Sequence, residues 1–152
     1  MGLRFDPTDE ELVFDYLLRK VRGEVLPPGY VNYCDDLYSH KNPWELFDKD
    51  LECPVYVFTH LKKRKDTHSN IIRSAGSGTW KGQNTKSFRD PGRNLIWFKK
   101  DFLFEVNKKN IKDGYDFSSK KNGHWLMTEY SLEDEGVNTC VLCTIYNKLA
   151  RT

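Results

Sequence analysis

A short segment near the middle of the chain combines cationic, amide and hydroxyl side chains. Trp80 is followed directly by Lys81, Gly82, Gln83, Asn84, Thr85 and Lys86. Lysine neutralises phosphates and releases counterions, glutamine and asparagine amides can pair with adenine, and a threonine methyl can contact thymine. The segment therefore indicates a surface that binds duplex nucleic acid. We expect Trp80 to anchor the strand in the core while its neighbours face outward by alternation.

The positive charge of the chain is concentrated around this segment. The net charge is only +2, but residues 55–100 hold 11 basic and 2 acidic side chains, whereas residues 1–54 hold 6 basic and 12 acidic ones. Such a concentration is typical of a protein with a polyanionic partner. A solvated basic face is the alternative that charge alone leaves open. Lys99, Lys100 and Lys108 are further candidates for phosphate contact.

The sequence offers little support for enzymatic or metal chemistry. It contains no glycine-rich phosphate loop, nucleophile elbow or paired-histidine metal helix. Cys140 and Cys143 have a metal-like spacing, but they lie in an apolar run that predicts a strand, where residues three apart face opposite sides. We expect no catalytic residues, metal or cofactor, although a cysteine and a histidine that meet in space stay an open alternative. No run approaches the ~20 apolar residues of a membrane helix, so no membrane contact is expected.

The N-terminal third predicts two helices. Thr8 and Glu11 have the spacing of a capping box, and the apolar stripe that follows has helical periodicity as far as Gly23. Asn42 and Pro43 begin a second, shorter helix that extends to Leu46.

The rest of the chain predicts strands at 55–59, 79–83, 95–98, 102–106, 125–130 and 140–146, with a turn at 75–78. Helices followed by strands without helical crossovers indicate an α+β fold, a twisted antiparallel sheet flanked by a few helices. The whole chain, 1–152, is expected to be one domain.

The chain resembles the NAC domain of plant transcription factors over nearly its whole length. Five blocks match in the family's order, and they are residues Leu3–Leu12, Asp36–Tyr38 with Pro43–Trp44, Gly76–Lys81, Trp125–Met127 with Glu129–Tyr130, and Val141–Cys143 with Ile145–Tyr146. The resemblance implies sequence-specific binding of double-stranded DNA in the nucleus, regulation of transcription and no enzymatic activity. It also implies that the strand beginning at Trp80 enters the major groove. Basic family positions that would contact phosphates are matched by Lys63, Arg64, Arg73, Lys99, Lys100 and Lys108.

The resemblance further implies a homodimer, or a heterodimer with related NAC proteins. Leu3 and Phe5 would lie in the dimer interface, and Arg4 would bridge to Glu11 of the other subunit. The same Glu11 carboxylate has lone pairs enough for its capping box as well. Family members usually carry a long variable tail, and we expect the chain to lack such a C-terminal regulatory region.

The strand departs from the family pattern at one point. Family members usually continue after Trp-Lys with Ala-Thr-Gly and an acidic residue, whereas this chain has Gly82–Lys86 and places Lys86 at the acidic position. The change makes the strand more cationic and puts the family's usual DNA site in doubt. It also motivates an alternative function, in which the domain pairs with other family members, reads DNA poorly and modulates their activity.

Overall fold

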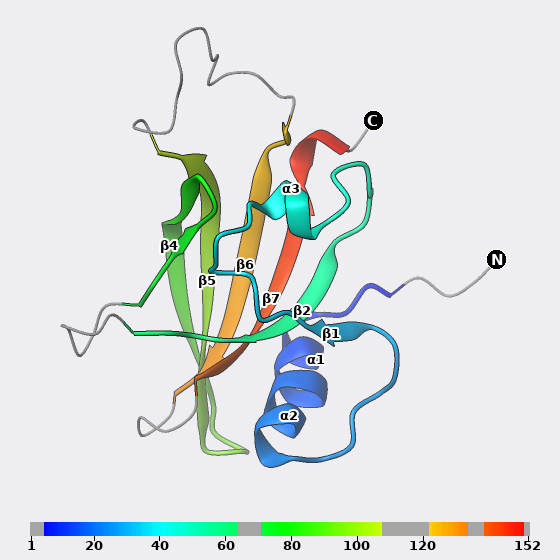
Figure 1. The fold of residues 1–152 in the computed structure, drawn as a ribbon. Coiled ribbons are helices and arrows are strands. Elements are labelled where there is room, and N and C mark those ends of the chain that lie inside the picture. Colours follow the sequence, from blue (N-terminus) through cyan, green and yellow to red (C-terminus); the bar gives the residue numbers. More distant parts are fainter. Residues whose placement is uncertain (1–4, 64–70, 108–121, 134–138, 151–152) are drawn as a thin grey trace, which may run out of the picture.

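The chain folds around one curled sheet with a helical segment against it (Figure 1), as seen in a computed structural model that describes residues 5–63, 71–107, 122–133 and 139–150. The sheet of the described residues has seven strands in the order β1-β2-β7-β6-β5-β4-β3. Their bounds are β1 Val31–Tyr33, β2 Val55–His60, β3 Ser74–Ala75, β4 Gly78–Asp90, β5 Leu95–Val106, β6 Trp125–Leu132 and β7 Cys140–Asn147. The α+β class expected from the sequence is confirmed.

One continuous helical segment covers one face of the sheet. It consists of α1 (Asp9–Glu11), a more loosely wound turn η1 (Leu12–Leu17) and α2 (Leu18–Arg22). The predicted capping box is present, because the Glu11 N–H donates to the Thr8 hydroxyl at 3.1 Å and the Thr8 N–H donates to the Glu11 carboxylate at 3.2 Å. The segment ends at Gly23, whose φ of 72° is the left-handed conformation that glycine adopts at helix ends.

Two features of the sheet differ from the sequence prediction. The sheet is mixed rather than antiparallel, since β1 pairs parallel to β2 while the other strand pairs of the described residues are antiparallel. Residues 34–54, which contain the short helix α3 (Pro43–Leu46), supply the long crossover that a parallel pair needs. The expected strands at 95–98 and 102–106 are one strand, β5, because its polar centre pairs with β4 on one side and β6 on the other.

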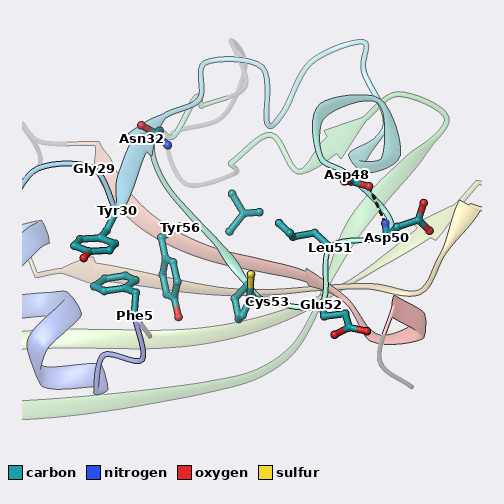
Figure 2. Close-up of a pocket in the computed structure, with 12 residues that line it drawn as sticks. Phe5, Gly29, Tyr30, Asn32, Asp48, Asp50, Leu51, Glu52, Cys53 and Tyr56 are labelled. Atoms are coloured by element: carbon teal, nitrogen blue, oxygen red, sulfur yellow. Dashed lines mark hydrogen bonds between the residues drawn. The ribbon is translucent and has the colours of Figure 1, made fainter. Parts of the chain in front are cut away.

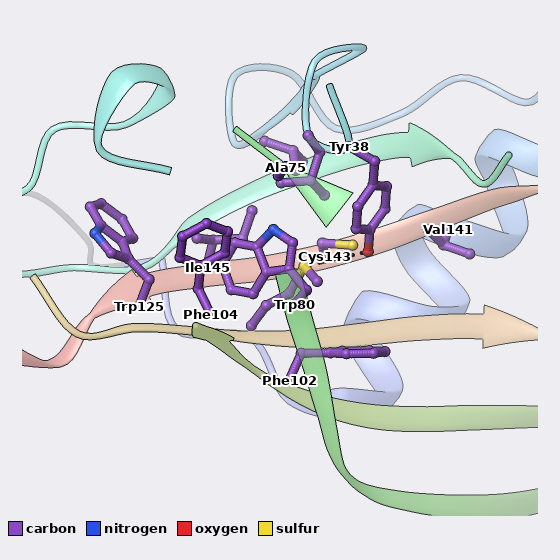
Figure 3. Packing of buried hydrophobic residues seen from close by; sticks show 12 residues of the cluster. Tyr38, Ala75, Trp80, Phe102, Phe104, Trp125, Val141, Cys143 and Ile145 are labelled. Atoms are coloured by element: carbon purple, nitrogen blue, oxygen red, sulfur yellow. Dashed lines mark hydrogen bonds between the residues drawn. The ribbon is translucent and has the colours of Figure 1, made fainter. Parts of the chain in front are cut away.

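The apolar core lies on both faces of the sheet. Under the helical segment, Leu12, Leu17 and Leu142 pack with Trp97. On the opposite face, β4 to β7 bury a second cluster, which includes Trp80, Phe104, Ile145 and Cys143 (Figure 3). The remaining element, η4 (Lys148–Ala150), follows β7. None of the described helices combines the length and apolar character that crossing a membrane requires.

Candidate nucleic-acid interface

The strand β4 emerges from the core at Trp80 and is then exposed along most of its length. The Trp80 indole is 1% exposed and meets the Phe104 ring edge-on, with 5.2 Å between centroids. Every residue from Lys81 to Ser87 is exposed. β3 pairs with Gly78 and Thr79, and Arg73 just before it accepts from the Trp80 backbone N–H, so the outer edge of β4 is open from Lys81 onward in the part of the chain that the structure describes. An open edge presents backbone N–H and C=O groups as well as side chains.

A bulge changes the side-chain alternation within this exposed strand. Gly82 pairs with Phe102, but Asn84 pairs with Asp101, so Gln83 is an extra residue opposite β5. The register places Lys81, Asn84 and Lys86 on the face of the sheet that carries the helical segment, whereas Thr85 lies on the other face. The Gln83 amide nitrogen is 3.3 Å from the Lys81 carbonyl oxygen. The bulge therefore brings two amide side chains and two ammonium groups to one short stretch of edge.

Local contacts fix the turn that leads into β4. The Asn42 side-chain oxygen accepts hydrogen bonds from the backbone N–H and the hydroxyl of Ser77, both at 2.9 Å. Gly76 has a φ of 53°, and a side chain there would overlap Asn42. Glu45 completes its half of the predicted α3 capping box by accepting from the Asn42 N–H at 3.0 Å. The start of β4 is thus tied to the start of α3.

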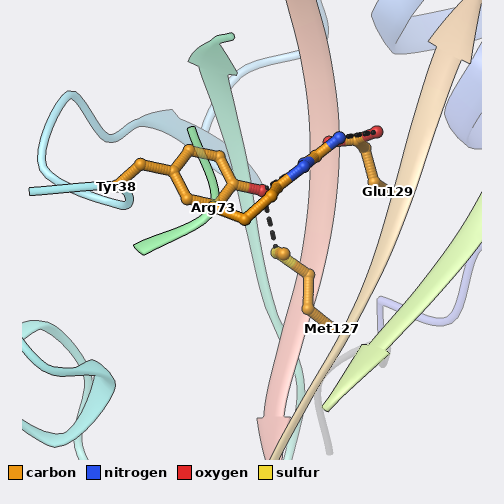
Figure 4. Close-up of polar contacts among 4 residues, drawn as sticks. All are labelled: Tyr38, Arg73, Met127 and Glu129. Carbon is orange, nitrogen blue, oxygen red and sulfur yellow. Dashed lines mark hydrogen bonds and ion pairs between the residues drawn. The ribbon is translucent and has the colours of Figure 1, made fainter. Parts of the chain in front are cut away.

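A buried ion pair lies behind the same turn (Figure 4). Arg73 donates to the Glu129 carboxylate at 2.6 and 3.3 Å and to the Tyr38 hydroxyl at 2.7 Å. The Arg73 side chain is 16% exposed and the Glu129 side chain 0%. Burial alone would lower the pKa of Arg73, but the hydrogen bonds and charge of Glu129 outweigh it and raise that pKa. The backbone N–H of Trp80 donates to the backbone carbonyl of Arg73 at 2.9 Å, so the residue that holds Glu129 is also bonded to the start of β4.

The remaining predicted phosphate contacts fall into four groups. Lys86 and Lys63 are exposed, and no ion pair of either is found within the described residues. Lys81 and Lys99 are paired, with Glu105 at 3.7 Å and with Asp9 at 2.9 Å. Half-buried Lys100 lies between Thr85 and Glu129 in the sheet register. Arg64 and Lys108 lie outside the described residues.

The predicted dimer residues are described only in part. Phe5 stacks on Tyr30, with 4.4 Å between ring centroids, and meets Tyr56 edge-on at 4.8 Å. Glu11 is exposed and holds its capping box. Leu3 and Arg4 lie outside the described residues. The assignment of these residues to a dimer interface stays a prediction.

A groove of about 630 Å³ lies at the other edge of the sheet, beside β1 and β2 (Figure 2). Phe5, Tyr30 and Tyr56 form one wall, and Asp48, Asp50 and Glu52 are among the residues that line it. These carboxylates repel a polyanion, whereas the exposed stretch of β4 carries cations and amides. The exposed strand is therefore the candidate nucleic-acid interface.

The described part of the chain contains no exposed cysteine pair and no cluster of metal ligands that would form a reactive site. Cys143 packs in the cluster with Trp80, and Cys140 packs in the cluster under the helical segment, so the two thiols lie on opposite faces, as their spacing predicted. Burial raises the pKa of both thiols. No group of three or more histidine, cysteine or acidic side chains among these residues is arranged to hold a metal ion.

Sequence reasoning predicted Trp80 as the anchor of β4, but it missed the buried pair of Arg73 and Glu129 that supports the strand. One signal for Glu129 was present: Trp125, Met127 and Glu129 alternate on one face of β6, and an acid on an apolar face requires a buried cation. Its partner, Arg73, is 56 residues away, and no sequence pattern identifies it.

The sequence of the chain matches a family of known proteins. Residues 1–132 match the family model described as No apical meristem (NAM) protein. The chain is 32% identical over 163 positions to NAC domain-containing protein 2 of Oryza sativa subsp. japonica, which covers 97% of this chain and 48% of that protein. It is 33% identical over 160 positions to NAC transcription factor 32 of Arabidopsis thaliana, with 97% and 58% covered. For NAC domain-containing protein JA2 of Solanum lycopersicum the identity is 35% over 158 positions, with 97% and 42% covered.

The chain belongs to the NAC family. That family consists of transcription factors rather than enzymes, which confirms the expectation that the chain is not an enzyme. The chain spans about half the length of the curated relatives it matches.

Proposed function

We propose that this chain is the DNA-binding and dimerisation domain of a transcription factor, which acts in the nucleus and reads double-stranded DNA with the edge of β4 in the major groove. The observation that carries the proposal is the exposed, open-edged stretch from Lys81 to Ser87. A strand edge fits the major groove, and that stretch holds the cations and amides that phosphates and bases require.

The contacts divide into two kinds. Gln83, Asn84 and Thr85 are assigned to base edges, since their side chains can hydrogen-bond or touch a thymine methyl, and Gly82 permits close approach. The phosphate contacts are assigned to Lys63, Arg64, Lys81, Lys86, Lys99, Lys100 and Lys108. Arg73 and Trp80 have a positioning role instead, because one is held by Glu129 and the other is buried in the core.

Dimerisation is assigned to the segment before the helix. Leu3 and Phe5 would pack across a two-fold axis, and Arg4 would bridge to the partner's exposed Glu11 carboxylate. The Thr8 N–H occupies only one position on that carboxylate, so the capping box leaves acceptor capacity for an arginine. Two copies of β4 in such a dimer would read paired half-sites.

Binding to duplexes selected from a random pool tests this proposal. For the wild type we expect a steep fall in affinity with salt, with Lys86→Ala reducing the slope of log affinity against log salt by about 0.9. Gln83→Ala is expected to cost about 1–3 kcal/mol on the selected site and to relax preference at one base pair. Lys148→Ala, an exposed lysine in η4, is the matched control and should leave the slope unchanged.

Two results would contradict the proposal. One is the absence of any selected duplex, and the other is an equal effect of Lys86→Ala and Lys148→Ala on the salt slope. The alternative modulatory function predicts poor DNA binding by the chain alone and reduced DNA occupancy when it is mixed with a DNA-binding relative. Increased occupancy of the mixture counts against that alternative.

A further inference from the structure

The carboxylate of Asp9 joins the start of the helical segment to two strands of the sheet. One oxygen accepts a hydrogen bond from the Tyr130 hydroxyl at 2.5 Å, and the other accepts from the Lys99 ammonium at 2.9 Å. Lys99 belongs to β5 and Tyr130 to β6, and the two residues are direct partners in the sheet register. Asp9 therefore fastens the first helical turn to neighbouring strands.

The Asp9 contact lies between the proposed dimer surface and the proposed DNA-binding strand β4. On the helical side, Asp9 directly follows the cap residue Thr8 and precedes Glu11 by two positions. On the sheet side, Lys99 pairs in register with Lys86 of the exposed strand. A short path of bonded and packed groups thus connects the proposed dimer carboxylate to the proposed DNA strand.

The contact is more protected than an ordinary surface ion pair. The side chains of Lys99 and Asp9 are 27% and 34% exposed, and Tyr130 is buried. Burial and the hydrogen bond to Asp9 both raise the pKa of Tyr130, so its hydroxyl stays a donor well into the alkaline range. A partly buried carboxylate with two donors is held in one orientation, and it orients both donors in return.

From this geometry we infer that Asp9 is a positioning residue that couples dimerisation to DNA binding. The inference rests on the proposed function. An ammonium has three donors, so Lys99 can bond Asp9 and still present a hydrogen to a phosphate beside Lys86. A dimer contact that fixes the first helical turn also fixes Asp9, which holds Lys99 in that position. DNA bound at Lys99 stabilises the same arrangement, and the coupling is reciprocal.

A half-site duplex separates this coupling from simple bivalency. A full palindrome joins two protomers whatever their internal contacts, whereas a duplex with one half-site occupies one protomer at a time. The measurement is the dissociation constant of the homodimer, obtained by sedimentation of the full chain with and without saturating half-site duplex. For the wild type we expect the duplex to tighten the dimer about fivefold or more.

Asp9→Asn and Lys99→Met are each expected to bring the factor by which duplex tightens the dimer close to one, and Tyr130→Phe is expected to reduce it. Lys41→Met, which breaks the exposed pair between Lys41 and Asp36, is the matched control and should keep the wild-type factor. Thermal melts show which variants are folded, and any one folded variant of the three is sufficient for the test. Loss of stability alone would weaken the dimer equally with and without duplex, so the ratio of the two dimer dissociation constants would not change.

Three results have distinct meanings. If the chain binds no duplex or forms no dimer, the proposed function fails. If both occur but half-site duplex leaves the dimer constant of the wild type unchanged, the coupling is refuted. If the wild type shows the factor and folded Asp9→Asn and Lys99→Met keep it, the coupling does not pass through Asp9.

Discussion

Removal of the Glu129 carboxylate is expected to destabilise the domain more than any exposed change in β6. The Glu129 side chain is fully buried and accepts two hydrogen bonds from Arg73. Glu129→Ala leaves that guanidinium with only the Tyr38 hydroxyl as a described acceptor. Breaking one side of a buried pair costs about 3–5 kcal/mol. With about 2–4 °C per kcal/mol for a domain of this size, the melting temperature should fall by roughly 6–20 °C.

Thermal and urea unfolding followed by circular dichroism measure this loss. Glu133→Ala, an exposed acid just beyond β6, is the matched control and should change the free energy of unfolding by less than about 0.5 kcal/mol. The double change of Arg73→Met with Glu129→Met should recover much of the loss, because no charge is then left buried. A loss below about 1 kcal/mol for Glu129→Ala would refute the reasoning, since the pair would then be dispensable to the fold.

Three other predictions concern the turn, the thiols and alkaline pH. Gly76→Ala should destabilise the domain more than Gly29→Ala. Both positions have a positive φ, which costs about 1–2 kcal/mol for alanine, but only at Gly76 does the added methyl overlap a neighbour. Equal melting temperatures of the two variants would contradict this. A thiol reagent should label exposed Cys53 in the native protein and buried Cys143 only after unfolding, as mass spectrometry of labelled peptides can show. Because the folded state raises the pKa of Tyr130 above the usual value of 10.0, the folded protein holds that proton more tightly and stability should fall above about pH 10. Tyr130→Phe should make this fall shallower in urea unfolding at successive pH values, and an unchanged slope would count against it.

Local patterns were sufficient to predict the elements with strong periodicity or caps. The capping box of Thr8 and Glu11, the helix end at Gly23 and the short helix after Asn42 depend on residues within a few positions of one another. The strands rich in β-branched and aromatic residues were predicted for the same reason.

The second half of β4 could not be predicted in this way. From Asn84 to Ser87 the strand is polar and exposed, so it lacks the alternation that indicates a half-buried strand. It is a strand because its backbone pairs with β5, which is a non-local property. The three residues of β1 are too few for a periodic signal, and their parallel pairing with β2 depends on the long crossover.

The candidate site likewise contains a part that is visible in the sequence and a part that depends on the fold. The run from Lys81 to Lys86 is contiguous, so its charge and amides are visible in the sequence, and the structure adds its exposure and its bulge. The groups that position it come from distant segments. Asp9 meets Tyr130 across 121 residues, and the bond between them depends on how the helical segment packs on the sheet.

Amide hydrogen exchange of the free chain and of its complex with a selected duplex tests most directly whether β4 is the DNA-reading edge. The N–H groups on the open edge between Lys81 and Ser87 should exchange rapidly in the free protein and become protected in the complex. The residues around Asp48 and Asp50 in the acidic groove should show no change. Protection of the groove, with exchange along β4 unaltered, would contradict the assignment of β4 as the DNA-binding strand.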